Sequence, residues 1–446
     1  MGKQTPDVVI GTVWRNNSRM GTPQSLPILL PTVGGQRWSC HSCGDCCRSL
    51  VVHLTAGDRE RIDAGDWASR LGVAPYLSVK RSWVLNKRSD GACVFLDDQG
   101  LCAIHVRSGE TAKPLACRMF PFSVRAVADG WQASIRFDCP SVVRSEGEPL
   151  DRSTIAIGEV ASLLPHRAGR NARLPFLKAR VRATEDELTM LTDRLARWLG
   201  DRSVAWNDRI TVAARLTTTL EYGRIRKVRG RRLAELVQLL LGALPKECGS
   251  PPPAPTDKQC GMLRQFAFAC SEHTSHDEFR SGAVAKVFIR VAQMRKAEAF
   301  RRGDGTVPAL PGFSKVVTFD AVESVQPARR DRESIEDLLT RYAVARLESR
   351  SVFGAGYYGW PVFRGLGALW LTLAAIGWFA RYVACSANRD SLQFADVARA
   401  VSIADRAATR LPALGTLAER ARLAYLMNDD GLARVIGAYV LVEQAP

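Results

Sequence analysis

The sequence predicts an α+β fold in which a small cysteine-rich α+β metal-binding domain precedes a larger, mainly α-helical region. Two observations lead to this prediction. Eight of the twelve cysteines lie before residue 140, among short segments of alternating polarity and Gly-containing turns. After residue 150 the apolar residues recur every three or four positions, which is typical of amphipathic helices. The composition, 46% hydrophobic and 24% charged, is that of a globular protein.

The composition along the chain suggests five segments. Pro, Gly and Asn are scattered through the first segment, and "CGSPPPAP" cannot continue a helix. The expected segments are an extended leader at 1–36, the cysteine domain at 37–145, a helical region at 146–247, a Pro-rich linker at 248–255 and a C-terminal helical domain at 256–446.

Within the cysteine domain, the pattern predicts one capped helix and two hairpins. Thr55 with Asp58 three residues later predicts the start of a short helix that runs through Ile62. "ACVFLDDQGLCAIH" is expected to turn near residues 98–100, with Cys93 and Cys102 on opposite arms. "SVRAVADGWQASIRF" is expected to turn at Asp129–Gly130, because Asp-Gly favours a type I′ turn.

The helical region carries start signals followed by apolar faces. Thr184 and Glu187 form a capping-box pattern, and Gly200 is the expected end of the helix that they begin. Similar apolar faces follow Ser334 and Ser391. The residues expected on the three buried faces are Leu188, Leu191, Leu195 and Trp198; Ile335, Leu338, Leu339 and Tyr342; and Phe394, Val397 and Val401.

The longest uncharged stretch, Gly365–Ala380, is bracketed by Arg364 and Arg381. Its sixteen residues are fewer than the roughly 20 that span a bilayer. We therefore expect a buried core helix and no stable membrane span. The first thirty residues contain no continuous apolar segment of the kind found in secretory signals. A cytoplasmic location is expected, where clustered cysteines bind metal rather than form disulfides.

The chain has a formal net charge of +17, most of it after residue 150. A basic surface favours acidic partners such as nucleic acid. However, the most basic segment, "RIRKVRGRR" at 224–232, has no interleaved aromatic residues on which bases could stack. Solvated, arginine-rich helix faces explain the charge more simply, so nucleic acid is not the expected partner.

The N-terminal cysteines are the candidate metal ligands: Cys40, Cys43, Cys46, Cys47, Cys93, Cys102, Cys117 and Cys139. The first three form a C-x2-C-x2-C run, a spacing that wraps the backbone around a metal centre. The side chains of adjacent residues 46 and 47 are expected to diverge, which favours either a cluster with several ligation points or two separate sites. Arg48 and Arg118 directly follow cysteines and could offset thiolate charge.

Four thiolates suffice for a tetrahedral zinc ion or a [4Fe–4S] cluster, and eight could serve two centres. Zinc sites usually take their ligands from two close-spaced pairs, whereas here a three-cysteine run is followed by a remote Cys139–Pro140. This arrangement is nearer to ferredoxin ligation. A [4Fe–4S] cluster is therefore the favoured interpretation, and zinc is the alternative. His41 and His105 are expected to be solvated loop residues rather than ligands.

The order of motifs resembles a known family. "CHSCGDCC", then "GACVFLDDQGLCAIH", then "KPLACRMFPF" are similar to the CxxCxxCC cysteine-cluster family (YkgJ-like, zinc- or iron-chelating), which is related to flagellin lysine-N-methylases. The resemblance covers about residues 37 to 141. It implies a zinc or iron–sulfur centre and, for some members, methyl transfer from S-adenosylmethionine to a lysine side chain of a protein substrate.

Two features of the methylating enzymes have no counterpart here. Cys43 and Cys47 have the first spacing of the C-x3-C-x2-C signature of radical S-adenosylmethionine enzymes, but position 50 is Leu. No expected strand is followed by a glycine-rich nucleotide-binding loop. The expected function is therefore a metal-cluster protein, with protein lysine N-methyltransfer as the activity that the resemblance implies. The alternative is a non-enzymatic metal-binding or sensing module whose basic helical half binds a protein or nucleic-acid partner.

Overall fold

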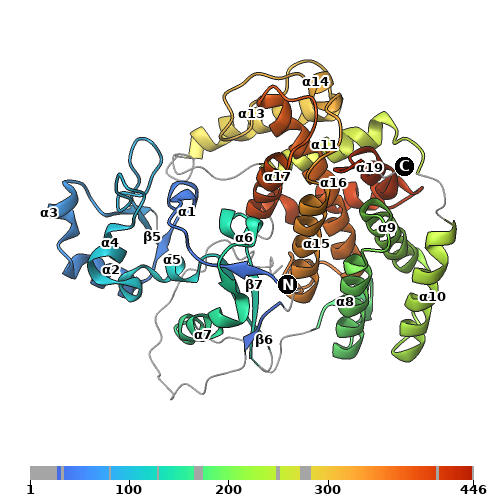
Figure 1. The fold of residues 1–446 in the computed structure, drawn as a ribbon, viewed down its shortest axis with the longest axis horizontal. Coiled ribbons are helices and arrows are strands. Elements are labelled where there is room, and N and C mark those ends of the chain that lie inside the picture. The colour runs from blue at the N-terminus through green and yellow to red at the C-terminus, as the bar shows by residue number, and fades with distance from the viewer. Residues whose placement is uncertain are drawn as a thin grey trace, which may run out of the picture. The chain divides into compact units, whose positions relative to one another are not determined.

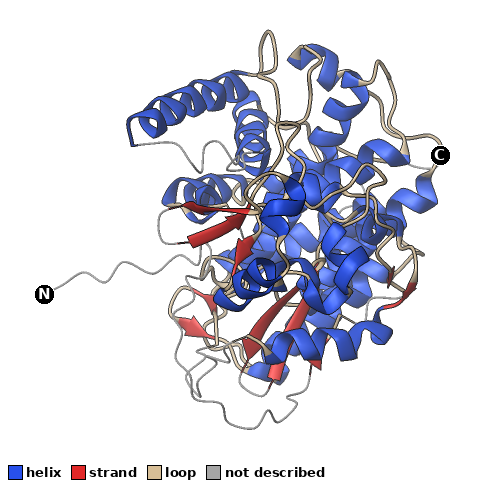
Figure 2. Cartoon of the chain, turned by 90° about the vertical axis from the view of Figure 1, so that its left-hand side faces the viewer, coloured by secondary structure: helices blue, strands red, loops and turns tan. Residues whose placement is uncertain are grey.

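The computed structural model describes residues 28–31, 35–79, 82–127, 130–164, 174–247, 252–271, 283–407 and 411–443. The chain forms two compact units, of which the first is built mainly from residues 35–172 and the second mainly from 173–273 and 284–446. Short strands and helices make up unit 1, whereas long helices dominate unit 2 (Figures 1 and 2). The predicted α+β class is confirmed.

The strands of unit 1 form three small sheets. In the first, β7 lies between β1, which is parallel to it, and β6, which is antiparallel. The second sheet has the order β3-β5-β4, and β2 pairs with β8 in the third. The strands are β1 Ile28–Leu29, β2 Arg37–Trp38, β3 His53–Leu54, β4 Tyr76–Val79, β5 Ser82–Leu85, β6 Phe122–Val127, β7 Gly130–Ile135 and β8 Glu148–Pro149. β1 thus lies inside the segment predicted as an extended leader.

The helices of unit 1 are short: α1 Asp45–Ser49, α2 Ala56–Ala64, α3 Trp67–Leu71, α4 Ala103–Ser108, α5 Leu115–Met119, α6 Pro140–Arg144 and α7 Thr154–Ser162. The start predicted for α2 is confirmed. The backbone amide of Asp58 donates to Thr55 Oγ1 at 3.1 Å, and the amide of Thr55 donates to Asp58 Oδ2 at 2.9 Å. Two otherwise unpaired amides at the helix start are satisfied in this way.

Both predicted hairpins are present in altered form. Val127 pairs with Gly130, so Gly130 begins β7 instead of forming the expected turn; residues 128–129 lie outside the described residues. The other segment reverses between Asp97 and Leu101, but it forms isolated bridges rather than strands, and its last residues belong to α4. An Asp97 carboxylate that accepts from two amides of this turn holds the reversal.

Unit 2 begins with the hairpin β9 Phe176–Lys178 and β10 Val181–Arg182 and continues as helices. The helices are α8 Glu185–Gly200, α9 Trp206–Tyr222, α10 Arg231–Glu247, α11 Asp257–Ser271, α13 Ala283–Arg302, α14 Phe319–Glu323, α15 Arg332–Glu348, α16 Val362–Ser386, α17 Phe394–Ala407, α18 Leu417–Leu426 and α19 Gly431–Ala438. The capping box of α8 and its end at Gly200 are confirmed.

The predicted buried faces of α8, α15 and α17 are largely confirmed. Their Leu, Ile and Val side chains and Tyr342 are buried, whereas Trp198 and Phe394 are only partly covered. α15 begins at Arg332, two residues before the predicted start. Of the predicted linker, residues 248–251 lie outside the described residues.

The centre of unit 2 is α16, on which α9, α11, α17 and α19 pack (Figure 1). Among the described residues it is the one helix long and apolar enough to cross a membrane, and 89% of its most apolar window is buried inside the protein. The predicted core helix is therefore confirmed, but the length argument behind it was wrong. The helix has 25 residues and includes both bracketing arginines. Arg381 can lie inside the protein because its guanidinium donates to the carbonyls of Gly377 and Val440 at 3.1 and 3.0 Å.

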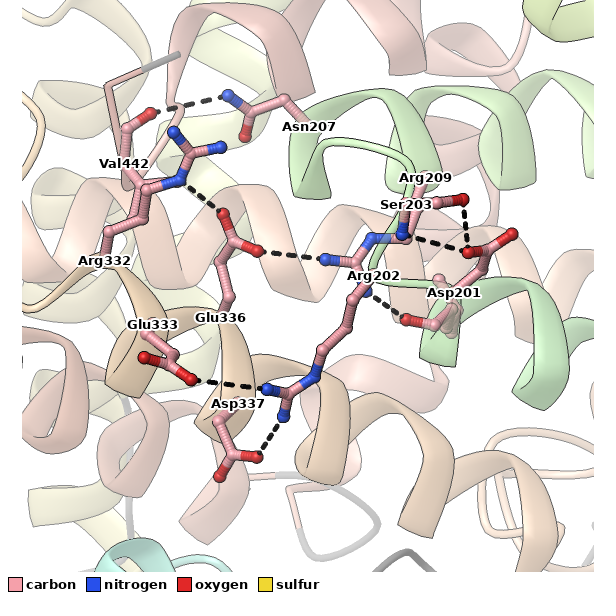
Figure 3. Close-up of polar contacts among 11 residues, drawn as sticks. Asp201, Arg202, Ser203, Asn207, Arg209, Arg332, Glu333, Glu336, Asp337 and Val442 are labelled. Atoms are coloured by element: carbon pink, nitrogen blue, oxygen red, sulfur yellow. Dashed lines mark hydrogen bonds and ion pairs between the residues drawn. The ribbon is translucent and has the colours of Figure 1, made fainter. Parts of the chain in front are cut away.

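An arginine–carboxylate network joins α9 to α15 (Figure 3). Arg209 of α9 is buried and donates to the carbonyl of Leu199 at 2.6 Å and to Glu336 Oε2 at 3.0 Å. Glu336 also accepts from Arg332 at 2.9 Å. At the rim of this network the exposed Arg202 contacts Asp337 at 2.9 Å. The network therefore includes a buried arginine, Arg209, and an exposed arginine, Arg202.

Candidate metal centre

The first cysteines are positioned by a short helix that begins after a glycine. Gly44 has a φ of 74°, a left-handed conformation that costs glycine little, and α1 follows directly. The start of the helix places Cys46 Sγ and Cys47 Sγ 4.0 Å apart. Two thiolates at about 2.3 Å from one zinc ion stand roughly 3.8 Å apart in tetrahedral geometry. The expectation that these adjacent side chains diverge was therefore wrong.

Three further cysteines are brought to this pair by the core of unit 1. The amide of Cys93 donates to the carbonyl of Cys47 at 3.0 Å, which fixes the two segments side by side. Cys93 belongs to the same apolar core as Phe95 and Leu96, and Cys47, Cys102 and Cys117 pack against that core. We call Cys46, Cys47, Cys93, Cys102 and Cys117 the inner thiol group.

Thiol protons are held tightly at three members of the inner group, Cys46, Cys93 and Cys117. Burial raises the pKa of Cys117 well above its usual value, and the neighbouring thiols of Cys93, Cys102 and Cys46 add to this. Burial likewise raises the pKa of Cys93 to about 11. The hydrogen bond with Cys47, followed by burial, raises the pKa of Cys46. Without a bound cation these thiols stay protonated at neutral pH, so metal binding must displace their protons.

Two lysines that sequence reasoning did not single out act on the inner group, Lys87 on Cys93 and Lys113 on Cys46 and Cys117. Lys113 lowers the thiol pKa of both Cys46 and Cys117, against the larger effects that raise them. Its ammonium group is fixed by Glu110 Oε2 at 3.0 Å. Sequence analysis assigned this role to Arg48 and Arg118, which are adjacent to cysteines along the chain. Lys113 lies four residues before Cys117 in the sequence, yet it is close enough to act on the Cys117 and Cys46 thiols.

The remaining three predicted ligands form an outer thiol group, which we define as Cys40, Cys43 and Cys139. Cys40 and Cys43 are exposed, and Cys139 is buried at the start of α6. Burial, together with the nearby thiol of Cys43, raises the pKa of Cys139 to about 11. Cys43 in turn interacts electrostatically with Cys40 and with Cys46. Cys43 is thus the link between the outer and the inner group.

The two candidate histidines are occupied elsewhere. His41 Nδ1 lies 2.9 Å from Ser141 Oγ, and His105 Nδ1 lies 2.8 Å from Glu110 Oε2. Both side chains are about half exposed. His41 lies in a loop, as expected, whereas the expectation of a loop was wrong for His105, which lies in α4.

The donor set fits zinc or iron in its chemistry, since eight free cysteines gather in unit 1. As placed, no three His, Cys, Asp or Glu side chains of the described residues converge on a single ion. The inner group therefore supplies neighbouring donors rather than a finished single-ion cage.

Comparison with protein families agrees with this set. Residues 39–139 match the model of a family named CxxCxxCC and described as "Putative zinc- or iron-chelating domain". This segment is a CxxCxxCC domain. The match begins one residue before Cys40 and ends at Cys139, so it encloses both thiol groups. No curated protein and no solved structure matches the chain. The CxxCxxCC domain thus supports metal binding by unit 1.

Proposed function

We propose that the CxxCxxCC domain holds an iron–sulfur cluster, with zinc as the alternative metal, and that the inner thiol group supplies the ligands. The observation that carries the proposal is the proximity of five thiols from four separate segments: Cys93 lies in one core, Cys47, Cys102 and Cys117 pack against it, and Cys46 Sγ lies 4.0 Å from Cys47 Sγ. Four cysteine thiolates are the usual ligand set of a [4Fe–4S] cluster.

The lack of a three-donor point among the described side chains supports a cluster over a single ion. A [4Fe–4S] cluster takes one thiolate at each iron, so its ligands stand further apart than four donors on one zinc ion. The inner thiols are close enough to affect one another's pKa, yet no three of the described donor side chains surround an ion-sized point. The pair Cys46–Cys47, 4.0 Å apart, is the feature that suits zinc.

The test is anaerobic purification followed by metal and sulfide analysis and a visible spectrum. We expect brown protein that contains iron and acid-labile sulfide and that bleaches on reduction with dithionite. Colourless protein with stoichiometric zinc and no iron, even after reconstitution with iron and sulfide, would show that zinc is the metal.

Single substitutions assign the ligands. Cys93→Ser and Cys117→Ser are expected to lose iron, whereas Cys40→Ser keeps it. Cys385→Ser, in unit 2, is the matched control because it removes a partly buried thiol far along the chain from the CxxCxxCC domain. Loss of iron on Cys40→Ser together with full iron in Cys117→Ser would move the ligand set to the outer group.

Methyl transfer from S-adenosylmethionine to a protein lysine remains a proposal that the family resemblance implies. Calorimetric titration of the metal-loaded protein with S-adenosylmethionine separates it from the alternative. Saturable binding supports the enzyme. Metal-loaded protein that does not bind S-adenosylmethionine supports a metal-binding or sensing module.

A further inference from the structure

Among its described side chains, helix α13 is anchored near its C-terminus. Near its C-terminus, Phe300 is fully buried, and α11 holds the backbone there: Arg264 Nε donates to the carbonyl of Phe300 at 3.0 Å, and Gln265 Nε2 donates to that of Ala297 at 3.3 Å. The described side chains from Ala285 to Ala299 are exposed or only partly covered. Helices in folded proteins owe most of their stability to packing of an apolar face, and most of α13 lacks such packing.

The uncovered part of α13 nevertheless carries an apolar face. Four large side chains are exposed, Val287 by 62%, Phe288 by 71%, Val291 by 43% and Met294 by 69%. Their spacing of one, three and three residues places them on one side of the helix. We call them the α13 stripe. Single exposed apolar residues are common, but four in a continuous row indicate an interaction surface for a protein, membrane or ligand.

The α13 stripe is flanked by positive charge. At 100° per residue, Arg290 lies beyond one edge of the stripe and Lys296 beyond the other, whereas Arg295 falls between Val291 and Phe288; all three are exposed. The sequence of α13 contains one acidic residue, Glu298, which is paired with Arg301 at 2.5 Å. The charge beside the stripe is therefore not neutralised within the helix.

We propose that α13 is a peripheral membrane-binding helix that lies on anionic lipid surfaces. A helix with an apolar stripe between rows of basic side chains can insert the stripe at the boundary of headgroups and acyl chains, while Arg and Lys contact lipid phosphates. The stripe is on a single convex helix, which suits a planar surface. Charge complementarity selects an anionic surface, and the net charge of +17 adds attraction to it. This inference is independent of the metal centre.

The experiment is co-sedimentation of the full, metal-loaded chain with vesicles of phosphatidylcholine alone or mixed with phosphatidylserine. We expect sedimentation with the mixed vesicles at low salt and release at high salt. Phe288→Asp with Met294→Asp should abolish it. Arg290→Gln with Arg295→Gln should weaken it roughly 30-fold, because each basic residue near the surface contributes a factor of about five.

The matched controls lie on α10 of the same unit. Leu239→Asp changes an apolar side chain that is 67% exposed, and Arg232→Gln removes an exposed charge. Both should bind vesicles like the unchanged protein. Failure of the unchanged protein to bind phosphatidylserine vesicles would overturn the proposal. An equal loss of vesicle binding in the α10 control variants would also overturn it. So would protein that does not bind vesicles but binds an acidic polypeptide such as polyglutamate through the α13 stripe.

Discussion

Arg229 donates two hydrogen bonds to Glu187, from Nε to Oε1 at 2.7 Å and from Nη2 to Oε2 at 2.6 Å. The same carboxylate accepts from the amides of Gly230 at 2.9 Å and Thr184 at 3.0 Å. One buried side chain therefore fixes both the start of α8 and the loop before α10. The basic segment at 224–232, expected to be a solvated helix end, contains this structural arginine.

The Glu187 carboxylate should make stability depend on pH. Burial alone would raise its pKa, but the hydrogen bonds from Arg229, Gly230 and Thr184 outweigh burial and lower it from 4.5 to about 2. A lowered pKa in the folded state stabilises the protein above about pH 4.5, and this stabilisation is lost as the pH falls towards 2. We expect Glu187→Gln to cost about 2 to 3 kcal/mol at pH 7, with the difference disappearing near pH 2.

Urea unfolding of both proteins at several pH values measures this difference. Glu235→Gln is the control, because Glu235 forms an exposed i,i+4 pair with Arg231 and should cost less than about 0.5 kcal/mol. A Glu187→Gln penalty that stays constant from pH 7 to pH 2.5 would contradict the assignment.

Two arginines of the network between α9 and α15 should differ in their contributions. Arg209→Ala leaves the Leu199 carbonyl without this donor in a desolvated site and leaves Glu336 with Arg332 alone, and it is expected to cost about 2 to 3 kcal/mol. Arg202→Ala removes a side chain that is 63% exposed and should cost less than about 1 kcal/mol. Denaturant midpoints of the two variants provide the comparison; similar losses would mean that burial does not govern the network.

Close packing against α16 should forbid a methyl group at Gly377. A Cβ there would lie 2.2 Å from the carbonyl oxygen of Tyr439. We expect Gly377→Ala to destabilise unit 2 by at least about 1 to 3 kcal/mol. Gly242→Ala, in α10, meets nothing within 4 Å and should stabilise the same unit by up to about 1 kcal/mol. Thermal unfolding that shifts in the same direction for both variants would refute this reading of the packing.

Removal of metal should affect one unit only. Because thiolate ligation is coupled to folding, we expect chelation to increase amide hydrogen exchange in the inner-group segments around Cys93 and Cys117. Exchange in α15 and α16, which belong to the other compact unit, should stay unchanged. Mass-spectrometric exchange resolves the two regions. An increase of similar size in both would mean that the metal stabilises the whole chain.

Local patterns predicted much of the secondary structure and little of the site geometry. The capping boxes at Thr55 and Thr184 depend on residues three apart, so the sequence alone reveals them. The length of α16 was missed because Arg381 was taken for a boundary, whereas tertiary carbonyl partners allow it inside the core. The division of the cysteines into two groups depends on contacts between distant segments, which spacing cannot show.

The central position of α16 has a consequence for the order in which the chain is made. Helices α9 and α11 pack on α16, yet they leave the ribosome long before residue 362 has been added. The apolar faces of α9 and α11 that pack on α16 therefore stay without this partner until α16 has been synthesised. Exposed apolar surface makes nascent chains prone to aggregate during this period. The CxxCxxCC domain has its own core and all eight candidate ligands within residues 39–139, so it can fold before residue 362 is added.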